Sequence, residues 1–178
     1  MSPARDRGFT LVEQLVIVLI LGVLAAIPAF SAITSLRSQR LKAGSEGIVT
    51  WLDELRRRAI QQSQTCSVEV AASSGLLRAA AGNQCGAFPP FDLAEAAGAP
   101  VLLCADALGP TATAPACTAS RGSLTIVLTP RGTSPGDALL QLAIAGHTPN
   151  RCVQLIAPLG LLRPGRIQNG RCDWSRAT

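Results

Sequence analysis

One short pattern in the sequence has the residue types of a hydrolase nucleophile. Gly132-Thr-Ser-Pro-Gly136 matches G-x-S-x-G, and Asp137 and His147 follow it in the order of a catalytic triad. Such a serine is activated on a sharp turn between a strand and a helix of an α/β sheet. Here strand-forming sequence lies on both sides. No phosphate-binding loop or dinucleotide-binding glycine pattern is present either. We therefore expect no enzymatic activity, no catalytic residue, no metal site and no cofactor.

Glu13 is the second residue whose position suggests a function, because this carboxylate lies near the start of an apolar segment. The segment from Leu11 to Ile33 is long enough for the roughly 20 residues that a membrane-spanning helix needs. A charge at the edge of such a span costs roughly 2 to 3 kcal/mol or more, so it usually has a partner. An amine is the natural partner of a carboxylate. Cleavage after Gly8 would create one at Phe9.

The same stretch resembles a known processing signal. Gly8-Phe-Thr-Leu-Val-Glu13, followed by the apolar run 14–30, is similar to the class III signal of type IV pilins and type II secretion pseudopilins. The resemblance implies that residues 1–8 are a prepilin leader peptide, which a prepilin peptidase removes by cutting between Gly8 and Phe9. It also implies N-methylation of Phe9, and pairing of Glu13 with the Phe9 amine of a neighbouring subunit during assembly.

Two simpler interpretations of this segment compete. A secretory signal peptide also has a basic start and small residues after its apolar core, but that core is typically about 7–15 residues long and carries no glutamate. The other is a plain single-pass anchor, which the pilin interpretation includes. We expect residues 9–33 to form a transmembrane helix that becomes part of a filament core.

Six cysteines lie beyond the apolar segment: Cys66, Cys85, Cys104, Cys117, Cys152 and Cys172. No two have the C-x-x-C spacing of zinc ribbons and redox motifs. An even number beyond a membrane anchor indicates three disulfides in an oxidising compartment. Several connectivities are possible, and we choose pairing in sequence order because it closes the shortest loops.

The positive charge of the chain is concentrated in its final third. The net charge is +5, and the region 121–178, with seven arginines and two aspartates, accounts for all of it. Arginine favours planar, bidentate contacts with phosphate or carboxylate. Pro164 and Gly165 indicate an exposed turn that would present Arg163, Arg166 and Arg171. These could contact DNA or carboxylates of a neighbouring subunit, although a genomic preference for arginine codons would also explain their number.

The expected elements make an α+β fold. Residues 34–64 continue the first helix, because Ile48, Leu52, Leu55 and Ala59 recur at the spacing of one buried stripe. The consecutive residues Arg56, Arg57 and Arg58 are assigned to a solvated face. Residues 65–178 are expected to form four or five strands in one small antiparallel sheet, without further helices. Within them, 82–121 lacks periodicity and predicts a long loop linked by disulfides.

The C-terminal half carries a second resemblance. Leu128-Thr-Pro-Arg-Gly-Thr133 and Ala157-Pro-Leu-Gly160, with Arg163 and Gly165-Arg166 behind them, are similar to the GspH/FimT group of minor pseudopilins and minor pilins. The helix end from Arg58 to Gln64 is similar too. This resemblance implies a pilin-like fold.

Together these features predict a subunit of a filament that is built at the inner membrane. It would span that membrane once, with its globular domain on the periplasmic side, and later enter a pilus or pseudopilus. Its partners would be the prepilin peptidase/N-methyltransferase, other pilin or pseudopilin subunits and the inner-membrane assembly platform. The first hypothesis is a minor pseudopilin of a type II secretion system. The alternative is a type IV pilus minor pilin that binds DNA during natural transformation.

Overall fold

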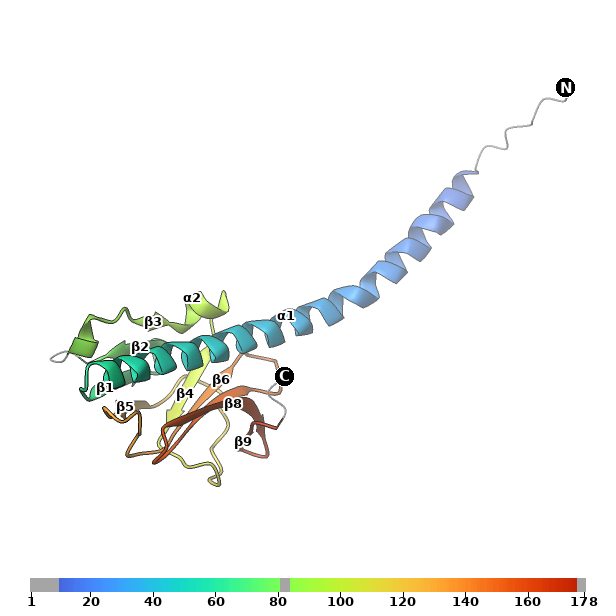
Figure 1. Cartoon of the computed structure of the whole chain (residues 1–178). Coiled ribbons are helices and arrows are strands. Elements are labelled where there is room, and N and C mark those ends of the chain that lie inside the picture. Colours follow the sequence, from blue (N-terminus) through green and yellow to red (C-terminus); the bar gives the residue numbers. More distant parts are fainter. Residues whose placement is uncertain (1–9, 81–83, 176–178) are drawn as a thin grey trace. The chain divides into compact units, whose positions relative to one another are not determined.

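The computed structural model describes residues 10–80 and 84–175, without the side chains of residues 24–31, 84 and 86. The chain divides into two units, Met1–Leu36 and Arg37–Thr178, which are considered separately. Helix α1 (Leu11–Gln61) contributes to both units, and every strand belongs to the second (Figure 1).

The second half of α1 has the buried stripe that the sequence predicts. Ile48, Leu52, Leu55 and Ala59 are almost completely buried. The helix ends at Gln61, three residues earlier than expected. The backbone of Ser63 has a φ of 51°, and the Gln64 N–H donates to the carbonyl of Ala59 at 3.1 Å. These are the features of a Schellman motif, which stops a helix by reversing the backbone.

Two antiparallel sheets follow, where one was expected. The first has the strand order β3-β2-β1-β5 and the second the order β4-β6-β7-β8-β9. The strands are β1 (Cys66–Ala71), β2 (Leu76–Ala79), β3 (Phe91–Asp92), β4 (Leu102–Asp106), β5 (Ser123–Leu128), β6 (Ala138–Ala143), β7 (Arg151–Ile156), β8 (Leu161–Gln168) and β9 (Arg171–Asp173). The prediction of an α+β fold with antiparallel pairing is confirmed, and the prediction of a single small sheet is wrong.

The expected loop at 82–121 contains regular structure, so that prediction is wrong in part. It includes a 3-10 helix η1 (Gln84–Ala87), strands β3 and β4, and helix α2 (Leu93–Ala97). The Asp92 side chain caps α2 by accepting from two backbone N–H groups, and Gly98 ends it with a φ of 61°. Elements this short contain too few turns to show a hydrophobic period.

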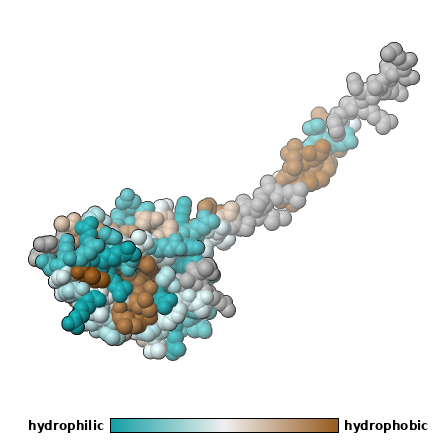
Figure 2. Space-filling model, viewed as in Figure 1, coloured by the Kyte–Doolittle hydropathy of each residue, from teal (hydrophilic) through white to brown (hydrophobic). Residues whose placement is uncertain are grey.

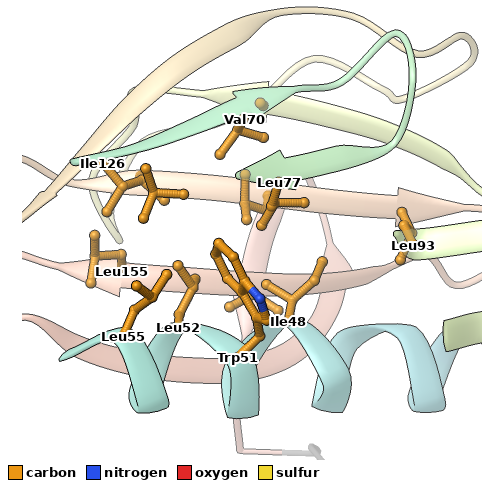
Figure 3. Packing of buried hydrophobic residues seen from close by; sticks show 14 of the residues in the cluster. Ile48, Trp51, Leu52, Leu55, Val70, Leu77, Leu93, Ile126 and Leu155 are labelled. Atoms are coloured by element: carbon orange, nitrogen blue, oxygen red, sulfur yellow. The ribbon is translucent and has the colours of Figure 1, made fainter. Parts of the chain in front are cut away.

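The core fills the space between α1 and the two sheets. Figure 3 shows Trp51, Leu52 and Leu55 of α1 pointing toward residues of both sheets, among them Ile126 and Leu155. This packing gives the sheets one shared core with the helix.

Trp51 also fixes the segment that follows η1. Its Nε1 donates to the carbonyl of Pro89 at 2.9 Å, and its ring lies 5.5 Å from Phe88 and 6.2 Å from Phe91 between centroids. Gly47 permits this approach, because a Cβ there would lie 2.9 Å from the Phe91 ring. Gly47 lowers helix propensity, but it leaves room for the Phe91 ring against α1.

The six cysteines form the disulfides that the sequence-order choice predicts. The pairs are Cys66–Cys85, Cys104–Cys117 and Cys152–Cys172. Two buried glutamines of the second sheet fix the segment between β4 and β5. Gln141 donates to the carbonyl of Pro115 at 3.2 Å, and Gln154 donates to that of Leu108 at 2.8 Å. Disulfides and buried amides together hold irregular backbone against the sheet.

Candidate functional site

The first turn of α1 contains Glu13 in a reciprocal hydrogen-bonding pattern with Thr10. The Thr10 N–H and hydroxyl both donate to Oε2 of Glu13, at 3.2 and 3.3 Å. In return, the Glu13 N–H donates to the Thr10 hydroxyl oxygen at 3.3 Å. This is a capping box, which satisfies backbone groups that the start of a helix leaves without intrahelical partners. The T-x-x-E spacing is its signal in the sequence, and our sequence analysis did not use it.

The turns that follow expose apolar side chains, and Figure 2 shows them as a hydrophobic patch on the visible face of this segment. Residues 15–21 are all apolar and cover almost two helical turns, so they point to every side of the helix. The exposed fraction ranges from 43% at Ile17 to 81% at Leu11 across ten residues: Leu11, Val12, Leu15, Val16, Ile17, Val18, Leu19, Ile20, Leu21 and Val23. A helix that is apolar on every side belongs in lipid or among other helices. Within the described residues, no helix meets the combined length and hydropathy requirement for a membrane span. The transmembrane assignment of residues 9–33 stays a prediction.

The start of the chain was also compared with known protein families. Residues 3–27 match the prokaryotic N-terminal methylation motif. This motif is the type IV pilin-like signal, and it supports a type IV pilin or pseudopilin-type protein. It implies processing by a prepilin peptidase, assembly with other pilins, and a location in a membrane or filament. No curated protein and no solved structure matches the chain.

The methylation motif contains all three residues that the sequence analysis assigned to processing and assembly. Glu13 lies in the described first turn of α1. Gly8 and Phe9, the predicted cleavage and methylation positions, lie outside the described residues. Cleavage and methylation therefore stay predictions that the motif supports.

The two stretches that resemble the GspH/FimT group meet beside the C-terminal end of α1. The Ser134 N–H donates to the carbonyl of Pro158 at 3.1 Å, which joins the turn after β5 to the turn after β7. Gly160 lies so close to the first turn that a Cβ there would be 2.6 Å from the carbonyl oxygen of Gly132. The resemblance singled out these two stretches, and the structure brings them into contact.

Arg56 of α1 connects both turns to the helix. Its Nε donates to the Gly132 carbonyl at 2.7 Å, and its Nη2 donates to the Leu159 carbonyl at 3.2 Å. We call Arg56, Gly132, Leu159 and Gly160 the helix–turn clamp. The assignment of Arg56 to a solvated face is wrong, because its guanidinium is directed at backbone carbonyls. The sequence offers no signal that separates it from Arg57, which forms an exposed pair with Asp53.

The exposed turn predicted at Pro164 and Gly165 is also wrong. Strand β8 continues through both residues and pairs with β7 from Leu161 to Arg166. The Ile167 N–H points to the β7 side, where it donates to Asn150. By alternation the nitrogen of residue 164 points to the other side, and β9 pairs there only from Arg166 onward. Proline has no N–H, so it fits an edge position of this kind.

Strand geometry separates the three arginines that were predicted to bind DNA. Side chains alternate between faces along β8, so Arg163 lies on one face of the sheet and Arg166 on the other. Arg171 pairs with Gln168 and shares the face of Arg166. Arg163 and Arg171 are exposed, and Arg166 is half-buried. The three do not form one surface turn, so DNA binding stays a prediction without the geometry on which it was based.

Arg166 is instead next to a buried guanidinium. It lies directly opposite Arg151, which is only 5% exposed. Burial lowers the pKa of Arg151, the neighbouring Arg166 lowers it further, and Glu46 of α1 opposes both effects. Arginine keeps its charge under these conditions. The end of this sheet therefore holds concentrated positive charge beside α1.

The residues of the G-x-S-x-G pattern have structural contacts. The Ser134 hydroxyl donates to the Gly136 carbonyl at 3.0 Å. Asp137 accepts from the Ala157 N–H at 2.7 Å. The His147 N–H donates to Ile144 within the turn between β6 and β7. These contacts stabilise turns, and none of them joins the three side chains into a triad.

Proposed function

We propose that this chain is a non-enzymatic filament subunit, a minor pseudopilin of a type II secretion system. The observation that carries the proposal is the methylation motif at residues 3–27, followed directly by helix turns with apolar side chains exposed on all sides. Such a helix requires lipid before assembly and neighbouring helices afterwards. The subunit would span the inner membrane once and carry its disulfide-bonded domain in the periplasm.

The helix–turn clamp supports the finer assignment. The stretches that resemble the GspH/FimT group are the same ones that Arg56 joins to α1. A pilin-type subunit transmits its position in a filament through this helix, so a rigid connection between α1 and the sheets is useful to it. The DNA-binding alternative lacks comparable support, because Arg163 and Arg166 lie on opposite faces of the sheet.

The N-terminus of the mature protein is the first test. Mass spectrometry of the protein extracted from membranes should find a chain that begins with N-methylated Phe9. The leader residues 1–8 should be absent. An N-terminus at Met1, or one near Ala32 as a secretory signal peptide would leave, would contradict the proposal.

Substitutions of Glu13 then test assembly. In the proposed filament its carboxylate pairs with the Phe9 amine of a neighbouring subunit. Glu13→Gln keeps the capping box, since glutamine also serves at this position, but it removes the negative charge. We expect Glu13→Gln and Glu13→Ala to be cleaved normally and to be incorporated poorly into filaments, as measured by the amount in sheared filament fractions. Normal incorporation of Glu13→Gln would show that assembly needs the capping box and not the negative charge of Glu13.

A further inference from the structure

Positive side chains gather at one end of the globular unit. Arg37, Arg40 and Lys42 lie on the part of α1 with which this unit begins. The turn between β6 and β7 reaches the same place, because a Cβ on Gly146 would lie 3.7 Å from Nη1 of Arg37. Arg151 opens β7 directly after that turn. One helix and one sheet end therefore contribute to a common cationic region.

The sheet adds two further arginines to this region. Arg166 lies opposite Arg151, and Arg171 follows the turn after β8. We call this region the basic end: Arg37, Arg40, Lys42, Arg151, Arg166 and Arg171. Arg40 and Arg171 are exposed, whereas Arg151 is buried.

Carboxylates at the basic end are fewer than cations. Glu46 lies 3.8 Å from Lys42, in a pair whose side chains are 45% and 59% exposed. Asp173 lies opposite Arg166 on β9. Elsewhere in the described globular unit, seven arginines are balanced by seven carboxylates, and some of them form pairs, such as Arg58–Glu54, Arg78–Glu69 and Arg121–Asp106. The positive excess is therefore a local property of this end.

We propose that the basic end binds the headgroups of anionic phospholipids. The apolar run ends at Ile33, and α1 continues without interruption through Lys42. In the sequence, Arg37, Arg40 and Lys42 follow Ile33 by only four, seven and nine residues. The headgroup layer of one leaflet is roughly 5–8 Å deep, and charges act across about 8–10 Å beyond it at 0.1–0.15 M salt. Cations so few residues after an apolar segment are within reach of the headgroup layer.

Trp174 provides a second observation in favour of a lipid surface. It is 38% exposed, and its Cα would lie 3.1 Å from a Cβ on Gly165, the residue before Arg166. Tryptophan is enriched at the level of lipid headgroups. Nucleic-acid surfaces for single strands use several aromatic rings in succession, whereas Trp174 is the only aromatic residue in the sequence after Phe91. The surface therefore fits lipid better than nucleic acid.

The inference rests on the proposed function in one respect, since the segment before Arg37 must lie in a bilayer. That point is tested first and separately, by flotation of the full chain with neutral phosphatidylcholine vesicles. Failure to float would refute the proposed membrane anchoring itself. Flotation without any lipid preference in the next experiment would refute only the headgroup site.

The decisive experiment measures lipid binding to the full chain in detergent micelles by native mass spectrometry. Phosphatidylglycerol should bind more tightly than phosphatidylcholine. Each neutralised basic side chain should weaken phosphatidylglycerol binding about fivefold, so Arg37→Gln with Arg40→Gln should weaken it roughly 25-fold. Arg37→Lys should retain most of the binding, because lysine keeps the positive charge that attracts the headgroup. Arg131→Gln, at an exposed arginine in the turn after β5, is the matched control and should change nothing.

Three results would overturn the assignment. Equal affinity for phosphatidylglycerol and phosphatidylcholine would show that the negative charge of the headgroup does not contribute to binding. Competition by millimolar inorganic phosphate would indicate a pocket for a free anion. Binding of a DNA duplex through Arg37 and Arg40, without a preference for anionic lipid, would identify a nucleic-acid surface. A melting temperature of the double variant equal to that of the unmodified chain confirms that any loss reflects binding.

Discussion

Replacement of Arg56 by methionine tests whether the helix–turn clamp joins the two turns to α1. Methionine keeps much of the aliphatic stem and removes both donors. The guanidinium donates to two backbone carbonyls, at 2.7 and 3.2 Å. A hydrogen bond to a charged group contributes roughly 1.5–3 kcal/mol to stability. The second bond is exposed and contributes less, so Arg56→Met should cost about 2–3 kcal/mol.

Urea unfolding with the disulfides intact measures this cost. For a domain of this size, a slope near 1.5–2 kcal/mol per molar urea is typical, so the midpoint should fall by roughly 1–2 M. Arg57→Met is the matched control. Arg57 is the next residue and pairs with Asp53 at 2.9 Å, but its side chain is 68% exposed. Pairs of this kind contribute only about 0.3–0.5 kcal/mol.

Hydrogen exchange gives a local measurement of the same contact. The Ser134 amide donates to Pro158 between the two turns, so it should exchange faster in Arg56→Met and at the normal rate in Arg57→Met. Equal midpoints for the two variants, together with unchanged exchange at Ser134, would refute the clamp. A lower midpoint without faster exchange would mean that Arg56 stabilises the helix and not the turns.

Three further predictions concern other contacts of the globular unit. Gly160→Ala should lower stability by about 2 kcal/mol or more, because the residue has a φ of 61° and no room for a Cβ; Gly136→Ala, where a Cβ meets nothing within 4 Å, should be nearly neutral in the same thermal melts. Replacing Cys152 and Cys172 together by serine should cost roughly 2–5 kcal/mol, and thiol labelling of the unmodified native protein should detect no free cysteine. Trp51→Phe should cost about 1–2 kcal/mol, because it leaves a backbone carbonyl without its donor 2.9 Å away, and exchange in the segment after η1 should report it.

The sequence predicts long, periodic elements well. The stripe at Ile48, Leu52, Leu55 and Ala59 repeats over more than three turns, and all four residues are buried. The disulfides also follow the sequence order. By contrast, α2 is shorter than two turns, and its evidence is one cap at Asp92 and one glycine at 98. A helix of that length cannot be recognised from the sequence in a segment rich in alanine, glycine and proline.

The arginine-rich end shows where local turn signals fail. A proline next to a glycine usually marks a turn, but Pro164 and Gly165 lie inside β8. Proline is acceptable because its nitrogen faces the part of the strand that β9 does not cover. Glycine is required because the backbone of Asp173 passes 2.5 Å from the position of a Cβ. Both reasons depend on the position of the neighbouring strand β9. The residues around Pro164 and Gly165 do not indicate where that strand lies.

The two roles of Glu13 are compatible because a carboxylate has more than one acceptor oxygen. The capping box uses Oε2 for both bonds from Thr10, and an ionised carboxylate offers about four lone-pair sites on two oxygens. In the proposed filament, a neighbouring amine could therefore bind Glu13 without breaking the cap. The cap would even favour this pairing, since it holds the side chain at the start of the helix and limits the rotamer entropy that pairing must overcome. Thr10→Val removes the hydroxyl of the cap and should therefore weaken assembly, whereas Thr10→Ser keeps the hydroxyl and should assemble normally.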